Sequence, residues 1–318
     1  MQAANVDLKI NKNGRFAGKL SERVRRSADP GNQTEVSRLL HITNESSVGL
    51  IMRPGGGAIG IEPGYAFFYD RYDRVSPNSE LLDSMRHIPK LRLNWKFLPK
   101  TAIFLEGEGI ITRYPSKGAF VDGGGTPTTT ATNVDTNILN VFLGAAGSIT
   151  SKISALIKVG YGDAFLETDN FRSLVAAIEG KYKVNSFMQF KLGASRAAAP
   201  TSLFRYVENN RVYAGYTQQF GGSTQLTIEG GAAFIRYGRP DQTTIDQLDA
   251  SALGGDSNAD SRFDTNITGS ASIDHQLTDW FTMSLMYNVN VRTSNYTTAI
   301  GETSYVRNDA LVRLTARY

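Results

Sequence analysis

The stretch FTMSLMYNVNVRTSN, residues 281–295, alternates between apolar and polar side chains with a period of two. One parity holds Phe281, Met283, Leu285, Tyr287, Val289 and Val291, and the other holds Thr282, Ser284, Asn288, Asn290 and Arg292. Successive side chains of a β-strand point to opposite faces, so this pattern predicts a strand with one apolar and one polar face. Two environments require such a strand. One is the core and surface of a soluble sandwich, and the other is lipid outside and water inside a barrel.

The same alternation recurs along the whole chain. The closing stretch RNDALVRLTARY, residues 307–318, stays apolar on one face up to Tyr318 and carries arginines on the other. The remaining copies lie at 5–12, 13–26, 34–53, 58–73, 84–98, 101–114, 136–149, 152–165, 171–184, 186–198, 205–220, 223–237 and 261–277. We therefore expect fifteen strands, and no segment sustains the periodicity of a helix.

The connections alternate between short and long, which separates the two environments. Short turns fall at 12–14, 54–57, 99–100, 150–151, 185, 221–222 and 278–279. Longer polar loops fall between them at 27–33, 74–82, 115–135, 166–170, 199–204, 239–260 and 296–303. All tight turns then lie at one end, as in outer-membrane barrels with short periplasmic turns and longer extracellular loops. Because lipid leaves no backbone group unpaired, the sheet must close on itself. The predicted fold is an all-β, antiparallel, up-and-down transmembrane barrel of the bacterial outer membrane.

Composition agrees with this class. The chain has 318 residues, no cysteine and a formal net charge of +4, and no dense basic run marks a nucleic-acid surface. No window contains the roughly 18 consecutive apolar residues of a membrane helix. We expect a single barrel domain over residues 1–318, without cofactor, metal or catalytic site.

The two strand faces predict a wet lumen and a lipid-facing wall. The residues that we expect to face the lumen are Lys90, Arg92, Lys96, Glu106, Glu108, Lys158, Glu179, Lys181, Lys191, Glu229, Asp264, Asn288, Arg307, Asp309, Arg313 and Arg317. Their charges have mixed sign, and neighbouring strands can pair them. Aromatic residues of the outer parity gather near the short turns, at Trp95, Phe97, Tyr182, Phe220, Phe281 and Tyr318. They predict a girdle at the periplasmic interface.

Strand parity indicates more than fifteen strands. Bacterial single-chain barrels have even strand numbers, and an odd count places residue 1 outside the cell. The first dozen residues also lack the apolar core of a signal peptide. We expect about sixteen strands, with fourteen or eighteen as alternatives, and a missing signal peptide and upstream strand.

Several stretches resemble a bacterial family of outer-membrane β-barrel porins associated with exopolysaccharide secretion. They are RPGGGAIGIEPGYAFFYDRYD (53–73), LNWKFLPKTAIFLEGEG (93–109), VGYGDAFLETDNFRSLVAAIEGKYKV (159–184) and DSRFDTNITGSASIDHQLTDWFTMSLMYNVNVRTSN (260–295). The resemblance spans about residues 13–318, and FLPKTA is its most distinctive piece. It implies a wide barrel that cooperates with a periplasmic polysaccharide-export protein, and it transfers no catalytic residues.

Candidate sites other than the lumen are weak. Residues 55–60 match G-x-G-x-x-G, but an alternating strand follows instead of a helix, so we interpret the glycines as a turn. The histidines His41, His87 and His275 have no metal-ligand spacing. His87, near Asp83 and Ser84, is the one candidate for catalysis, and interface polarity is the favoured explanation. Strand glycines are interpreted as room for curvature and neighbouring rings.

Three functions remain open at this point. The first is an outer-membrane conduit for a secreted polysaccharide, in which Phe68, Phe142, Tyr213 and Tyr305 offer ring faces to sugars. The second is a trimeric general diffusion porin, and the third is a non-conducting barrel that anchors an envelope machine. The long loops 115–135 and 239–260 either constrict the mouth or form surface tips. Expected partners are outer-membrane lipids, the barrel-assembly machinery through the strand ending at Tyr318, and a periplasmic polysaccharide-export protein. No nucleic-acid partner is expected.

Overall fold

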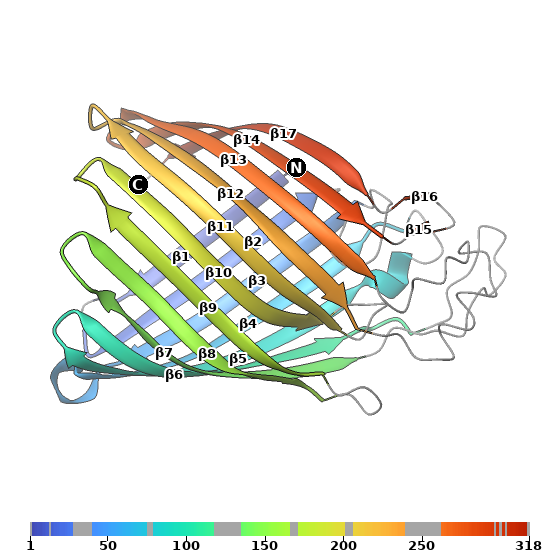
Figure 1. Ribbon diagram of the computed structural model, residues 1–318, viewed down its shortest axis with the longest axis horizontal. Coiled ribbons are helices and arrows are strands. Elements are labelled where there is room, and N and C mark those ends of the chain that lie inside the picture. The colour runs from blue at the N-terminus through green and yellow to red at the C-terminus, as the bar shows by residue number, and fades with distance from the viewer. Residues whose placement is uncertain are drawn as a thin grey trace.

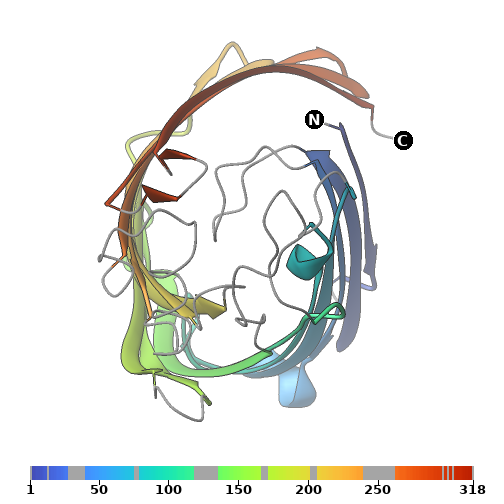
Figure 2. The same cartoon turned by 90° about the vertical axis from the view of Figure 1, so that its right-hand side faces the viewer.

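The computed structural model consists of one large antiparallel sheet that curves into a barrel (Figures 1 and 2). It describes residues 2–12, 14–27, 40–74, 79–117, 135–165, 171–200, 206–238, 262–295, 297–298, 301–302 and 304–316. The sheet strands are β1 (Gln2–Ile10), β2 (Phe16–Ser27), β3 (His41–Met52), β4 (Ile59–Tyr72), β5 (Ser84–Leu98), β6 (Thr101–Arg113), β7 (Thr136–Ser148), β8 (Ile153–Ala164), β9 (Phe171–Lys183), β10 (Met188–Pro200), β11 (Tyr206–Phe220), β12 (Thr224–Tyr237), β13 (Phe263–Thr278), β14 (Phe281–Ser294) and β17 (Tyr305–Ala316). The barrel fold predicted from alternation is confirmed.

Each strand pairs with its sequence neighbours, and the hydrogen-bonded order runs from β1 to β17. The fifteen strands of the barrel sheet correspond to the fifteen alternating segments of the sequence, and no sixteenth strand joins this sheet in the described residues. With fifteen antiparallel strands, β1 and β17 run in the same direction, and no ladder joins these two strands in the described residues. Seen along the barrel in Figure 2, β1 and β17 are the two edges of the ring of strands, whereas Figure 1 shows the N and C ends well apart along the barrel.

The tight turns all lie at one end of the barrel, named here the short-turn end (Figure 1). The glycine-rich match at residues 55–60 belongs to one of them. It forms the 3-10 turn η1 (Pro54–Gly57), in which Gly55 and Gly57 have φ of +64° and +92°. A side chain is strained at such φ values, so glycine is required for the turn, and strand β4 follows directly. The interpretation as a turn is confirmed.

The outer face of the sheet is apolar and exposed. Leu192 and Val312 each expose 67% of their surface, and Leu143 exposes 58%, which only lipid makes favourable for so many side chains. The expected aromatic girdle is present at the short-turn end. Trp95 lies 6.0 Å from Phe97 and Trp280 lies 5.6 Å from Phe281 between ring centroids. Tyr318 lies outside the described residues.

Two short features modify the loops predicted between strands. Residues 296–303 were expected to be plain loop, but β15 (Thr297–Thr298) and β16 (Gly301–Glu302) pair as a small hairpin. Between β4 and β5, the 3-10 turn η2 (Ser79–Leu82) lies inside the ring of strands, as Figure 2 shows. Most of the long loops 115–135 and 239–260 lies outside the described residues. Within the described part of the chain, no helix has the length and apolarity to cross a membrane.

Candidate functional site in the lumen

The cross-strand register places the predicted charged residues on one face of the sheet. Lys90 faces Glu108, Arg92 faces Glu106, Lys181 faces Lys191, and Asn288 faces Asp309. The opposite face carries the exposed leucines and valines, so the charged face is the lumen wall. Lys96 lies beside a register shift near the β5–β6 turn and is exposed. Arg317 lies outside the described residues.

Glu106 is the centre of the first charged cluster, on β5, β6 and β8. Its two oxygens lie 3.2 Å from Arg92 Nη1 and 2.8 Å from Lys158 Nζ, and its side chain is only 18% exposed. Beside it, Lys90 Nζ lies 2.5 Å from Glu108. One carboxylate on β6 thus holds a cation from the neighbouring strand β5 and a second cation from β8, beyond β7, which ties the wall together from β5 to β8.

Two phenylalanines lie under this cluster, each directly opposite a glycine. Phe104 faces Gly144, and Phe142 faces Gly160. A Cβ at Gly144 would lie 2.4 Å from Phe104 Cζ, and one at Gly160 would lie 2.9 Å from Phe142 Cδ1. The rings therefore lie flat over the glycines, as was expected for strand glycines in general. The lumen side of each ring is covered by a cation, because Arg92 lies 3.7 Å from the Phe104 centroid and Lys158 lies 4.0 Å from that of Phe142.

The second charged cluster repeats this layering on β9 to β12. Tyr213 lies between Gly193 and Gly231 in the register, and its hydroxyl donates a hydrogen bond of 2.5 Å to Glu179. Lys191 and Arg211 lie 5.4 and 5.0 Å from its ring centroid, and both pair with Glu229. Glycine, ring, cation and carboxylate thus form the same sequence of layers in both clusters.

This layering corrects the expectation that lumen aromatic rings offer free faces to sugars. Arg86 lies 4.8 Å from the Phe68 centroid, Lys158 covers Phe142, and Lys191 and Arg211 cover Tyr213. The physical reason is that a cation on a neighbouring strand gains cation–π energy from a ring held flat at the wall. Tyr305 lies opposite Arg292 in the register. At Phe68, Phe142 and Tyr213 the wall therefore presents charged groups and not ring faces.

The lumen face of β13 and β14 is different, because its middle carries no charge. Thr268, Ser270 and Ser272 on β13 face Asn290, Asn288 and Met286 on β14. Nearer the short-turn end, the Ser284 hydroxyl donates a hydrogen bond to Asp274. Hydroxyl and amide groups thus form a neutral polar strip, whereas β5 to β12 form a charged wall.

Asp264 is not an open lumen charge. Its side chain is 0% exposed and accepts hydrogen bonds from Arg262, Arg292, Ser294 and the Tyr237 hydroxyl, the last at 2.8 Å. These residues close the long-loop end of β12, β13 and β14. Two arginines around one carboxylate stabilise this corner, so its role is structural.

The long-loop end of β10 leaves the wall and turns inward (Figure 2). Its ladder with β9 ends at Arg196, while its ladder with β11 continues to Pro200. Beyond that point Ala198 packs on Ile138 of β7 and Ala164 of β8. Arg196 spans the resulting gap: its guanidinium donates to Leu174 O at 3.1 Å and to Glu208 at 2.7 Å. The β10–β11 hairpin and η2 both narrow the lumen at this end.

The loop between β6 and β7 is fastened at its base by Asp135. The Tyr114 amide donates a hydrogen bond of 3.1 Å to Asp135, and Lys117 Nζ lies 2.7 Å from it. Burial alone would raise the pKa of Asp135. The bonds from Lys117 and the Tyr114 amide outweigh burial and lower its pKa below the ordinary value of 3.8.

His87 and Asp83, the candidates for catalysis, do not contact each other. His87 accepts or donates a hydrogen bond of 2.6 Å with the Tyr65 hydroxyl on the outer face. Asp83 is buried and pairs instead with Arg74 at 2.7 Å and with the Tyr72 amide. His275 lies on the outer face and forms a hydrogen bond with Thr224. In the described ranges, no group of three or more potential ligands is placed to hold a metal ion.

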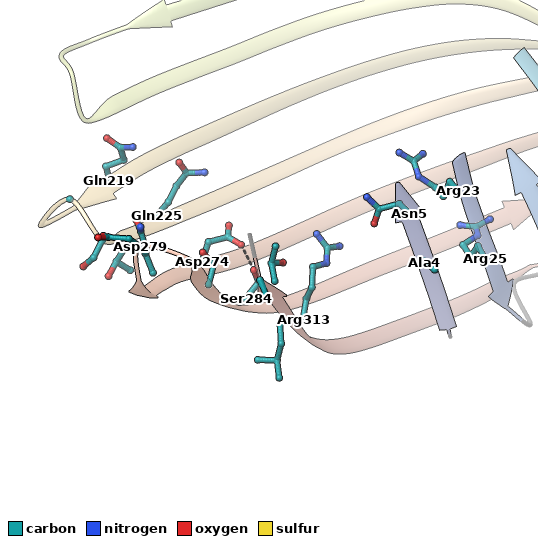
Figure 3. Close-up of a pocket in the computed structure, with 18 residues that line it drawn as sticks. Ala4, Asn5, Arg23, Arg25, Gln219, Gln225, Asp274, Asp279, Ser284 and Arg313 are labelled. Atoms are coloured by element: carbon teal, nitrogen blue, oxygen red, sulfur yellow. Dashed lines mark hydrogen bonds between the residues drawn. The ribbon is translucent and has the colours of Figure 1, made fainter. Parts of the chain in front are cut away.

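A cavity of about 1210 Å³ lies between the short-turn ends of β13, β14 and β17 and the start of β1 with the facing part of β2 (Figure 3). Arg23 and Arg25 of β2 line one side, and Asp274, Ser284 and Arg313 of β13, β14 and β17 line the other. Arg23 pairs with Glu45 at 3.2 Å. The lining is polar, as expected for space filled by water.

Sequence reasoning missed Phe104, Arg196 and the cover of cations over the rings. Alternation places Phe104 on the same face as Glu106, but its partner Gly144 could not be found by counting from the short turns, because Thr101 pairs with Gly147 and not with Ile149. Arg196 gave no signal, because the bend in β10 depends on packing against β7.

No protein-family model and no curated protein sequence matches this chain. Among solved structures, the outer membrane channel DcaP of Acinetobacter baumannii superposes with a TM-score of 0.50 and 13% identity, over 99% of this chain and 97% of that one. The fold is that of an outer-membrane β-barrel. An outer membrane channel from Pseudomonas putida F1 gives a TM-score of 0.42 and 12% identity, with 95% of each chain covered. The alcaligin receptor FauA of Bordetella pertussis gives 0.49 and 11%, and the match covers 93% of this chain and 60% of the receptor.

Proposed function

We propose that this barrel is a water-filled outer-membrane conduit through which an extracellular polysaccharide or another polar polymer is exported. The observation that carries the proposal is the hydrated charge along the inner wall. Lys90, Lys181 and Arg211 are paired and still 44–48% exposed, and a polar cavity lies between β2 and the short-turn ends of β13, β14 and β17. Charged groups that were enclosed in a dry core would be far less exposed.

The arrangement of the wall suits passage and not tight binding. In both charged clusters the cations pair with carboxylates, so one ionic solute finds no concentrated site of opposite charge. The neutral strip on β13 and β14 adds hydroxyl and amide groups, which hydrogen-bond sugars individually and weakly. Conduction requires that each contact be weak enough to leave. We propose no chemistry for the protein itself.

The resemblance of residues 13–318 to porins associated with exopolysaccharide secretion adds the polymer class. It also adds a periplasmic polysaccharide-export protein as a proposed partner, because a barrel supplies no force for export. Insertion into the outer membrane would proceed through the barrel-assembly machinery, which we propose recognises the last strand.

A diffusion channel is the second candidate. It is favoured by the likeness to the outer membrane channel DcaP, which covers nearly all of both chains. A diffusion channel should pass small solutes and assemble as a trimer on a native gel.

The test uses proteoliposomes that contain the purified full chain and two trapped fluorescent cargoes, a short oligosaccharide and a labelled dextran. Release of both cargoes supports the polymer conduit. Release of only the oligosaccharide from a trimeric protein supports the diffusion channel. Retention of both by a correctly folded barrel overturns the two proposals and leaves a structural anchor.

A further inference from the structure

We propose that six lysines at the short-turn end form a capture site for a polyanionic chain, of the class of carboxylate-bearing polysaccharides. This set, the lysine collar, consists of Lys9, Lys19, Lys96, Lys100, Lys152 and Lys183. The inference rests on the proposed function, because it names the polymer class that the conduit takes up.

The collar residues come from four hairpins but gather at one end. Lys9 and Lys19 face each other across β1 and β2, on the lumen face. Lys100 and Lys152 lie in the β5–β6 and β7–β8 turns, and Lys183 is the last residue of β9. All six lysines are exposed. A chain that approaches from the periplasm would therefore meet these side chains before the charged wall.

The collar lysines differ from the lysines of the lumen wall in their ion pairs. Among the described residues, no carboxylate oxygen lies within 4.0 Å of any collar ammonium group. By contrast, the wall lysines Lys90, Lys158, Lys181 and Lys191 each have a carboxylate at 2.5–3.1 Å. The charge of the wall is thus neutralised in place, and the charge of the collar is available to a ligand.

The two ammonium groups of Lys9 and Lys19, which face each other across β1 and β2, repel each other unless an anion lies beside them. Like charges directly opposite each other on neighbouring strands destabilise a sheet. Asp7 shares the lumen face of β1 with Lys9, but no ion pair joins the two in the described residues. The other carboxylates near this end have other positions or partners: Glu62 accepts from Asn94, Asp274 accepts from Ser284, and Asp279 lies in the β13–β14 turn. A polyanion along the collar would relieve the repulsion between Lys9 and Lys19.

The residue type favours a polymer over a protein partner. Lysine is depleted in protein–protein interfaces, where aromatic residues and arginine form the anchors. A lysine ammonium is a flexible, strongly hydrated point charge that contacts a carboxylate without fixed bidentate geometry. Several such contacts attract a repeating anion and still release each unit, as a conduit requires.

The experiment measures block of single-channel current by oligogalacturonate and by a neutral dextran of equal length. Since the chain has no cysteine, a Ser223→Cys variant labelled from one side reports the direction of insertion. From the short-turn side, oligogalacturonate should block at about tenfold lower concentration than dextran, and this advantage should shrink with added salt. From the long-loop side the advantage should be absent.

Replacing all six collar lysines with glutamine should abolish the advantage of oligogalacturonate and leave the dextran block unchanged. A double variant, Lys152→Gln with Lys183→Gln, is compared with a control double variant, Arg71→Gln with Arg236→Gln. The control removes two exposed cations near the long-loop ends of β4 and β12. The first pair should reduce the advantage, and the second should not.

Equal block by the two polymers in the wild-type chain would overturn the collar while leaving the conduit in place. An advantage that survives in the six-lysine variant would also overturn it. If that variant keeps the advantage but loses binding of polyglutamate, the collar serves an acidic protein instead. Failure of both polymers to enter, together with retained dextran in proteoliposomes, would count against the conduit itself.

Discussion

The middle of the lumen wall and its short-turn mouth use the same residue type in opposite ways. At mid-wall, Lys158 pairs with Glu106 at 2.8 Å and covers the Phe142 ring at 4.0 Å. At the mouth, Lys183 is exposed and has no described ion pair. The difference indicates that a lysine on this sheet stabilises the barrel where a carboxylate lies within reach, as Glu106 does for Lys158. Elsewhere it is left for contact with a ligand.

The largest expected effect comes from breaking the mid-wall cluster. Glu106→Gln leaves Arg92 and Lys158 facing each other without a counter-charge, so the free energy of unfolding should fall by about 2–3 kcal/mol, below the range for a fully buried pair. Urea titration of the protein in lipid vesicles, read by gel mobility, measures this. Asp7→Asn is the control, since Asp7 has no ion pair in the described residues. Equal losses in both variants would contradict the account.

The glycine layer gives the next effect. Gly144→Ala places a methyl group 2.4 Å from Phe104 Cζ and 2.7 Å from Ile157 O, and we expect a loss of about 1–3 kcal/mol. Gly180→Ala is the matched control, because nothing lies within 4 Å of its added Cβ. Part of the loss should be recovered when Phe104→Leu is combined with Gly144→Ala. A Gly144→Ala barrel as stable as the Gly180→Ala barrel would show that the ring is not held against the strand.

The long-loop end of the β10–β11 hairpin should open when Arg196 is replaced. Arg196→Ala deletes the hydrogen bonds to Leu174 O and Glu208, and bonds of this charged kind contribute about 1.5–3 kcal/mol. Hydrogen exchange of the amides in 197–200 and 206–209 should accelerate about tenfold or more. Arg71→Ala removes an exposed arginine of β4, away from β10 and β11, and should leave those amides unchanged. Unaltered exchange in the Arg196 variant would show that Arg196 does not hold this end of the hairpin in place.

The loop base between β6 and β7 gives a smaller, pH-dependent effect. Because the pKa of Asp135 is lowered in the folded protein, its bonds are fully present above the ordinary value of 3.8 and are lost as pH falls through the lower folded value. Protection of the Tyr114 amide should therefore persist at pH 4 and fall below it. Asp135→Asn should lose this pH dependence. Protection that falls already between pH 6 and 5 would contradict the lowered pKa.

The smallest expected effect is the change in the free energy of unfolding when a collar lysine is replaced. Lys183→Gln should change the free energy of unfolding by no more than about 0.5 kcal/mol, as exposed substitutions do. Lys158→Gln should cost clearly more, since it removes an ion pair and a ring contact. Both are read by the urea titration, and similar losses would mean that collar lysines have partners in the membrane.

Much of this architecture could be predicted from parity alone. The alternation of residues 281–295 predicted the two faces of β14. The exact register with β13 could not be predicted from the turn expected at 278–279, because Thr278 still belongs to β13 and the register shifts between Gln276 and Thr278. Glu106 and Lys158 could be placed on the lumen face by alternation as well. Their contact could not, because it depends on rotamers and on the ring of Phe142 beneath them. The inward turn of β10 was also beyond reach, because the sequence of Ala197–Pro200 gives no sign of the packing of Ala198 on Ile138.

The central claim is that the barrel is an open, water-filled conduit with a neutralised wall. Single-channel conductance of the purified full chain in a planar bilayer tests it most directly. We expect large, stepwise conductance with weak selectivity at high salt, which becomes selective for anions at low salt as the collar is less screened. A correctly folded barrel that conducts no ions under either condition would contradict the claim.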